Sequence, residues 1–75
     1  MGRSTQVTNS IRQLRSERGG LTQAELASRI GVTRQTVIAI EQGRYSPSLE
    51  MAFQIARALG VSLDDVFQYP DNESA

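Results

Sequence analysis

The chain has 75 residues, enough for one small domain, and contains eight arginines and eight acidic residues but no lysine, histidine or cysteine. These absences exclude disulfides, thiol nucleophiles, histidine bases and the usual zinc ligands, and the longest apolar run, Val37 to Ile40, is too short to span a membrane. The charge is uneven, with seven arginines against three acidic residues in 1–45 and one arginine against five in 46–75, which favours a basic face for a polyanionic partner.

The first part of the chain predicts an arm followed by a helix. Residues 1–7 are expected to form a flexible N-terminal arm. Thr8 or Asn9 can cap a first helix, and the Gly19-Gly20 pair ends it. No stretch of the sequence shows the period-two alternation of a strand.

Two helices follow with the spacing of a helix-turn-helix. Thr22 and Glu25 form the capping-box pattern that starts one helix, and Gly31 ends it. Thr33 can cap the next helix, which is predicted over about residues 34–42.

The apolar residues of this pair fit the same arrangement. Ala27 is small where the two helices would cross, and Val37 can fill the space between them. Gly31 can adopt the left-handed conformation that the turn requires.

Two more helices complete the predicted domain. Ser48 can cap a fourth helix that Gly60 ends, and its apolar stripe, in which we include Leu49, is expected to face the core. Ser62 can cap a short fifth helix that runs to about Phe67.

The five short helices predict an all-α, compact domain over residues 8–69 and a flexible tail over residues 70–75. The adjacent Asp64 and Asp65 suit a helix start, and no nucleophile, phosphate loop or metal-ligand group accompanies them. We therefore expect no enzyme activity, no metal, no cofactor, no small-molecule ligand and no membrane partner. Because no secretory signal is present, the expected location is cytoplasmic.

Four stretches carry a resemblance to a known family: Leu21–Ala27, Ile30–Val37, Ile40–Leu49 and Ala56–Leu63. They resemble the Cro/C1-type, or xenobiotic-response-element, helix-turn-helix family in its short single-domain form, over about residues 9–69. The resemblance implies a lambda-repressor-like DNA-binding domain, double-stranded DNA as the partner, and a role as a transcriptional regulator, with repression as the expected effect.

The third helix is expected to read base edges in the major groove. Arg34 can donate two bonds to guanine, and Gln35 can pair with adenine. Ile38 either touches a thymine methyl group or packs under the first helix or the loop over residues 44–48. The expected base-reading residues are Thr33, Arg34, Gln35, Thr36, Ile38 and Ala39.

Other roles are implied by the resemblance. Gln23 is expected to contact a phosphate and to brace Gln35, while Arg44, Tyr45 and Ser46 are expected to hold the sugar–phosphate backbone. The alternative for each of these residues is a solvated surface side chain.

The resemblance also implies a partly buried structural ion pair between Arg15 and Glu41. Removing one partner of such a pair is expected to unfold the protein, so a loss of DNA binding in that variant would not be a sign of DNA contact.

The C-terminal part is expected to form a homodimer interface for binding a palindromic operator. Its apolar residues exceed what so short a helix needs for its own packing, and they are Leu63, Val66, Phe67 and Tyr69. The alternative is that these side chains only close the core of a monomer.

A different class of function stays open, because a fold alone does not assign a function. The chain could be a protein-interaction module, such as an antitoxin or a transcription-factor bridging component. Arg34 and Gln35 discriminate between the two classes, since a pure interaction module has no need of base-reading side chains.

Overall fold

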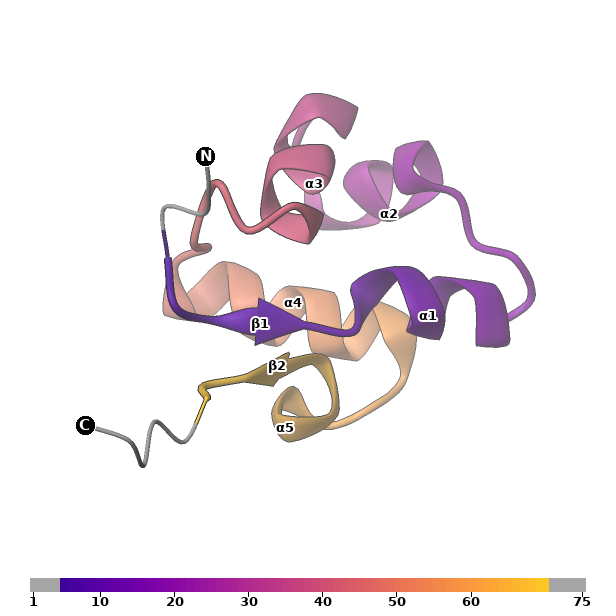
Figure 1. The fold of residues 1–75 in the computed structure, drawn as a ribbon. Coiled ribbons are helices and arrows are strands. Elements are labelled where there is room, and N and C mark those ends of the chain that lie inside the picture. The colour runs from indigo at the N-terminus through magenta and orange to yellow at the C-terminus, as the bar shows by residue number, and fades with distance from the viewer. Residues whose placement is uncertain (1–4, 71–75) are drawn as a thin grey trace.

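Five helices and one pair of short strands make up the part of the chain that the computed structural model describes, residues 5–70 (Figure 1). In chain order the elements are β1 (Thr8–Asn9), α1 (Ile11–Glu17), α2 (Gln23–Ile30), α3 (Arg34–Glu41), α4 (Leu49–Leu59), α5 (Leu63–Val66) and β2 (Phe67–Gln68). The predicted five-helix fold is confirmed, and a minor two-stranded sheet is added to it. Most of the expected flexible arm and tail falls on residues 1–4 and 71–75, outside the described residues.

Single polar side chains define the starts of four helices. Thr22 accepts a bond from the Glu25 backbone N–H at 3.0 Å, and the Glu25 carboxylate accepts from the Thr22 N–H at 2.9 Å. Thr33, Ser48 and Ser62 accept equivalent bonds at the starts of α3, α4 and α5. Each side chain satisfies a donor that the helix itself leaves free, so these four predicted starts are confirmed.

The strand pair corrects two predictions about helix ends. Thr8 and Asn9 form β1, which pairs with β2 in antiparallel fashion so that Asn9 faces Phe67. Helix α1 begins after Ser10, whose backbone N–H donates to the Val66 carbonyl at 2.8 Å. Phe67 therefore belongs to a strand and not to the end of the fifth helix. The sequence did not predict this pair, because strands of two residues are too short to show an alternating pattern. The two strands are also far apart along the sequence, although they pair in the fold.

Helix α4 lies at the centre of the fold, between α2 and α5 (Figure 1). The side chains buried most completely are Ile11, Leu26, Val37, Ile40, Ile55, Leu59 and Val66. Leu49, expected in the core, is instead 69% exposed. It is the first residue of α4 and shares a face with Phe53, one turn later, which is also exposed. The inward face of α4 is thus narrower than its apolar residues suggest.

Candidate nucleic-acid interface

Helices α2 and α3 are joined by a short turn whose geometry depends on Gly31. This glycine has left-handed dihedrals, φ 76° and ψ 32°, and the next N–H, of Val32, donates to the Ala27 carbonyl at 3.0 Å. Ala27 and Val37 are both buried. The predicted helix-turn-helix is confirmed, with a small buried residue on its first helix and a glycine at its turn.

The first turn of α3 presents two long polar side chains to solvent. Arg34 and Gln35 are exposed, and within residues 5–70 neither side chain forms a hydrogen bond. Thr33 and Thr36 differ, because their hydroxyl groups bond to each other at 3.1 Å and Thr33 also caps the helix. Arg34 and Gln35 are therefore free to contact a ligand, whereas the threonine hydroxyls are already engaged.

The remaining expected base readers lie one turn further along α3. Ile38 and Ala39 are both half-buried. Ile38 lines an open pocket between α1, α2 and α3, together with Arg12, Gln23 and Gln42. Its side chain thus lies at the boundary between the packed and the open face of the helix.

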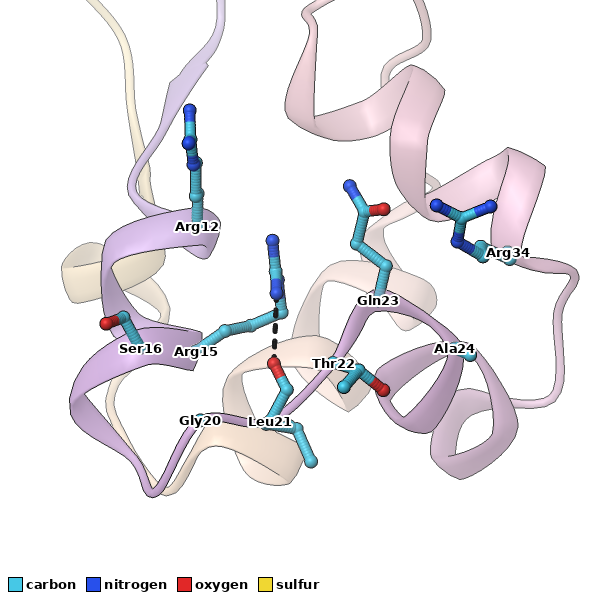
Figure 2. A pocket seen from close by; sticks show the side chains of 9 residues that line it. All are labelled: Arg12, Arg15, Ser16, Gly20, Leu21, Thr22, Gln23, Ala24 and Arg34. Carbon is cyan, nitrogen blue, oxygen red and sulfur yellow. Dashed lines mark hydrogen bonds between the residues drawn. The ribbon is translucent and has the colours of Figure 1, made fainter.

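One carboxylate connects the first three helices. Glu41 Oε2 accepts from Arg15 Nε at 2.7 Å, and Glu41 Oε1 accepts from Arg15 Nη2 at 3.2 Å. Arg15 Nη1 also donates to the Leu21 carbonyl at 2.9 Å (Figure 2), and the ion-paired side chains are 14% and 8% exposed. Gln23 Nε2 donates to Glu41 Oε1 at 3.1 Å. The structure thus brings Arg15 and Glu41 together, and it corrects the expected contact between Gln23 and Gln35.

Asn9, which the sequence suggested only as a possible cap of the first helix, also supports the end of α3. Its Nδ2 donates to the carbonyls of Ile40 at 3.0 Å and Glu41 at 3.4 Å. Its Oδ1 accepts from the Ile11 N–H at 3.2 Å, so one side chain links β1, α1 and α3. The only sequence signal was a short amide next to a helix start, which is ambiguous without the position of α3.

An open pocket of about 450 Å³ lies where α1, the α1–α2 connection and the starts of α2 and α3 meet (Figure 2). Its lining consists of Arg12, Arg15, Ser16, Gly20, Leu21, Thr22, Gln23, Ala24 and Arg34. Figure 2 shows Arg12 and Arg34 on opposite sides of Gln23. The structure therefore brings Gln23 and Arg34 together and adds Arg12, which the sequence did not single out.

The loop after α3 presents the residues expected to hold the DNA backbone. Arg44, Tyr45 and Ser46 are all exposed. The loop leaves the helix at Gly43, which has a left-handed φ of 76°, and the Arg44 backbone N–H donates to the Ala39 carbonyl at 2.9 Å. This bond and the Gly43 conformation fix the start of the loop while its side chains remain accessible.

The expected dimer residues divide into two groups. Val66 is completely buried and cannot touch a second chain, which corrects its assignment. Leu63 and Phe67 are half-buried and Tyr69 is 71% exposed, and all three line an open, largely apolar groove. The exposed Leu49 lines the same groove.

Residues 5–70 contain neither a membrane-spanning helix nor a group of metal ligands. No helix there combines the length and the hydropathy that crossing a membrane requires. No three acidic, histidine or cysteine side chains come together there as a group that could hold a metal ion.

Comparison with known proteins gives consistent matches. The helix-turn-helix family matches residues 11–66. An uncharacterised helix-turn-helix transcriptional regulator of Methanothermobacter thermautotrophicus is 64% identical over 58 residues, which cover 76% of this chain and 83% of the relative. Another from Methanocaldococcus jannaschii is 57% identical over 53 residues, covering 71% and 80%.

A phage protein and a solved structure extend these matches. A cryptic-phage transcriptional repressor of Vibrio cholerae is 41% identical over 59 residues, which cover 79% of this chain and 52% of the relative. The crystal structure of a restriction-modification controller protein of Aeromonas hydrophila has a TM-score of 0.67 and 33% identity, covering 73% of this chain and 78% of that chain.

Proposed function

The chain belongs to the Cro/C1-type helix-turn-helix family of transcriptional regulators, and we propose that it is a sequence-specific repressor that reads the major groove with α3. Its fold and relatives are those of DNA-binding regulators and not of enzymes. The DNA-binding unit comprises residues 8–69, and the protein acts in the cytoplasm.

The observation that carries this proposal is the pair of unengaged side chains at the start of α3. Arg34 can donate two bonds to guanine O6 and N7, and Gln35 can pair with adenine N6 and N7. The contacts of Glu41 with Arg15 and Gln23 fix α3 against α1 and α2. Base-reading side chains are therefore held on a rigid support, which selectivity requires.

Backbone contacts complete the proposed interface. Gln23, Arg44, Tyr45 and Ser46 contact phosphates and sugars, which orient the protein without reading sequence. Thr33, Thr36, Ile38 and Ala39 lie close to the bases and contribute mainly through their methyl and methylene groups, because the threonine hydroxyls bond to each other.

We further propose that two copies bind one palindromic site, with the apolar groove as their contact. A domain of this size buries limited surface on DNA, so pairing increases affinity. Two recognition helices would then lie about 34 Å apart, one turn of DNA. Leu49 and Tyr69 are the large apolar residues of this groove that are most exposed.

Repression is proposed because a small domain bound at its operator can act by occupying that site. The relative from Vibrio cholerae carries the name of a transcriptional repressor and matches 79% of this chain.

The same apolar groove favours a second candidate function, a protein-interaction module. In that case Leu49, Leu63 and Tyr69 would contact a different protein, and DNA affinity would depend only on charge. An antitoxin or a transcription-factor bridging component would behave in this way.

Fluorescence anisotropy with labelled DNA from upstream of the chain's own gene tests the proposal. Scrambled DNA and the double variant Arg34→Ala/Gln35→Ala serve as controls, each at two salt concentrations. Selective binding that the double variant loses supports base reading, because each two-bond contact contributes about 1–3 kcal/mol of discrimination. Binding that scrambled DNA matches overturns base reading at this site and favours the interaction module.

A further inference from the structure

Arg12 is an arginine whose charge the fold does not neutralise. It lies three residues before Arg15 on α1, so both side chains emerge from one side of the helix. Arg15 takes both oxygens of Glu41, while Arg12 forms no ion pair within residues 5–70. Its exposed guanidinium is therefore available to an anion.

The pocket of Figure 2 gives this guanidinium a suitable neighbourhood. Its nine lining residues include Arg12, Arg15 and Arg34 but no acidic residue. The pocket on the other side of Arg12 differs, because Glu17 and Glu41 line it. An anion beside Arg12 is consequently favoured in the pocket of Figure 2, because Glu41 lines both of the other pockets that include Arg12.

Hydrogen-bond donors line the same pocket. Ser16, one turn after Arg12 on α1, also lines it, but Figure 2 shows its hydroxyl pointing away from α2, so the donors come from α2. Gln23 and Ala24 open α2, and the first N–H groups of a helix have no acceptor within the helix. The Glu25 carboxylate does not line the pocket and is held on the Thr22 N–H.

The position of Arg12 relates this pocket to the recognition surface. Figure 2 shows the Arg12 and Gln23 side chains extending to the same side of α1 and α2. Arg12 also lines a second pocket with Gln23 and Ile38 of the recognition helix, where the Glu41 carboxylate is already paired with Arg15. A duplex that contacts α3 would therefore pass beside Arg12.

We propose that Arg12 binds a backbone phosphate of DNA, which enters the pocket between α1 and the first turn of α2. This inference rests on the proposed function. A guanidinium offers paired donors that match two phosphate oxygens. Because phosphates do not depend on base identity, the contact strengthens binding to every sequence alike.

The test compares Arg12→Ala, Arg12→Lys and Arg57→Ala. Arg57 is an exposed arginine in the last turn of α4 and lines none of the pockets named above, so it controls for the loss of one charge. Affinity is measured against salt concentration on the upstream DNA and on scrambled DNA. Thermal unfolding of each variant establishes that the fold is intact, as expected for exposed side chains.

Arg12→Ala should make the slope of log affinity against log salt less negative by about 0.9 on both DNAs. Arg12→Lys should keep most of that slope, and Arg57→Ala should leave it unchanged. A slope for Arg12→Ala equal to that of Arg57→Ala would overturn the phosphate site. A loss confined to one DNA sequence would also overturn it, because it would indicate a base contact.

Neutral methylphosphonate groups at single DNA positions make the test local. One substituted position should weaken the wild-type protein and leave Arg12→Ala unaffected, since each change removes the same contact. Additive effects at every position would contradict the proposal. Equal wild-type affinity for the upstream and the scrambled DNA would refute the proposed function, but the salt slopes would still test the phosphate contact of Arg12. A wild-type protein that binds no DNA would overturn both proposals.

Discussion

At the scale of single residues, Glu41 is a shared partner of the helices that hold the recognition surface. Its two oxygens accept three bonds from Arg15 and Gln23, so they connect α3 with α1 and with the start of α2. The ion-paired side chains are largely shielded from water. A single truncation here therefore acts on three helices together.

Glu41→Ala is expected to lower the free energy of unfolding by about 3 kcal/mol, because it leaves the shielded Arg15 guanidinium without its counter-ion. Chemical denaturation with urea measures this change. Gln23→Ala is the matched control, since it removes one hydrogen bond to the same carboxylate and should cost about 1 kcal/mol. Equal costs for the two variants would show that the charge of Glu41 contributes nothing beyond hydrogen bonding.

Glu25 gives a pH-dependent contribution at the start of α2. Its hydrogen bonds from the backbone N–H and the hydroxyl of Thr22, with the charge of Arg29 as a smaller cause, lower the pKa of the carboxyl below its ordinary value of 4.5. A carboxylate with a lowered pKa stabilises the folded state above its unfolded pKa. This contribution of Glu25 to the free energy of unfolding is lost as the pH falls below 4.5 and then through the lower pKa that the carboxyl has in the folded state.

Wild-type protein is accordingly expected to melt at a higher temperature than Glu25→Gln at neutral pH, and this difference should shrink below pH 4.5. Glutamine keeps the capping geometry without the charge, so the comparison isolates the carboxylate. Thermal melts of both proteins between neutral and acidic pH provide the measurement. A difference that stays constant across this range would be incompatible with the lowered pKa.

At the scale of elements, the turn of the helix-turn-helix depends on backbone conformation and not on space. Gly31 has a φ of +76°, and a Cβ placed there would meet no atom within 4 Å. Gly60, at the end of α4, has a φ of +72° and is equally open. Both positions therefore test the left-handed conformation without a steric clash.

Gly31→Ala should destabilise the protein by about 1 kcal/mol, because a Cβ disfavours the left-handed region. Gly60→Ala should cost a similar amount, and thermal unfolding of the two variants compares them directly. A much larger cost at Gly31 alone would mean that neighbouring groups restrict the turn in ways that the open geometry does not account for.

The elements that the sequence predicted are those defined over four or five neighbouring residues. Thr22 with Glu25, Thr33, Ser48 and Ser62 each satisfy donors within their own first turn, so local sequence is sufficient to place them. The β1–β2 pair depends on residues from the two ends of the domain. Nothing local distinguishes that pairing from a loop.

The candidate site shows the same division between local and distant contacts. The exposure of Arg34 and Gln35 was expected from their place in the first turn of the capped α3, ahead of the buried Val37 and Ile40. The bond from Gln23 to Glu41 could not be derived in this way, because several partners on α3 lie within reach of one flexible amide. Arg12 became recognisable as a candidate only from the pocket that it lines with Gln23 and Arg34.

At the scale of the whole molecule, the apolar groove determines how many copies act together. Its lining comes from the two ends of the domain and from the start of α4, and it includes Leu49, Leu63, Phe67 and Tyr69. Leu49 and Tyr69 expose 69% and 71% of their surface, although both are large and apolar. A second copy covering this groove would remove that surface from water.

Leu49→Asp is expected to abolish the proposed dimer and to leave the fold intact. The side chain is mostly exposed, and an aspartate at the first position of α4 suits the positive end of the helix dipole. At a dimer contact, however, the same charge would be buried without a partner. Sedimentation equilibrium should then report a monomer at concentrations where the wild-type protein is a dimer.

Gln54→Asp is the matched control, because it places an equal charge on an exposed position of α4 that does not line the groove. It should dimerise like the wild-type protein. On DNA, Leu49→Asp should lose affinity for a palindrome and keep its affinity for a single half-site, since each recognition helix remains intact. A Leu49→Asp protein that still dimerises would show that the dimer contact lies elsewhere. A wild-type protein that is monomeric on palindromic DNA would show that no dimer forms, and a monomer bound to one half-site would then be the functional unit.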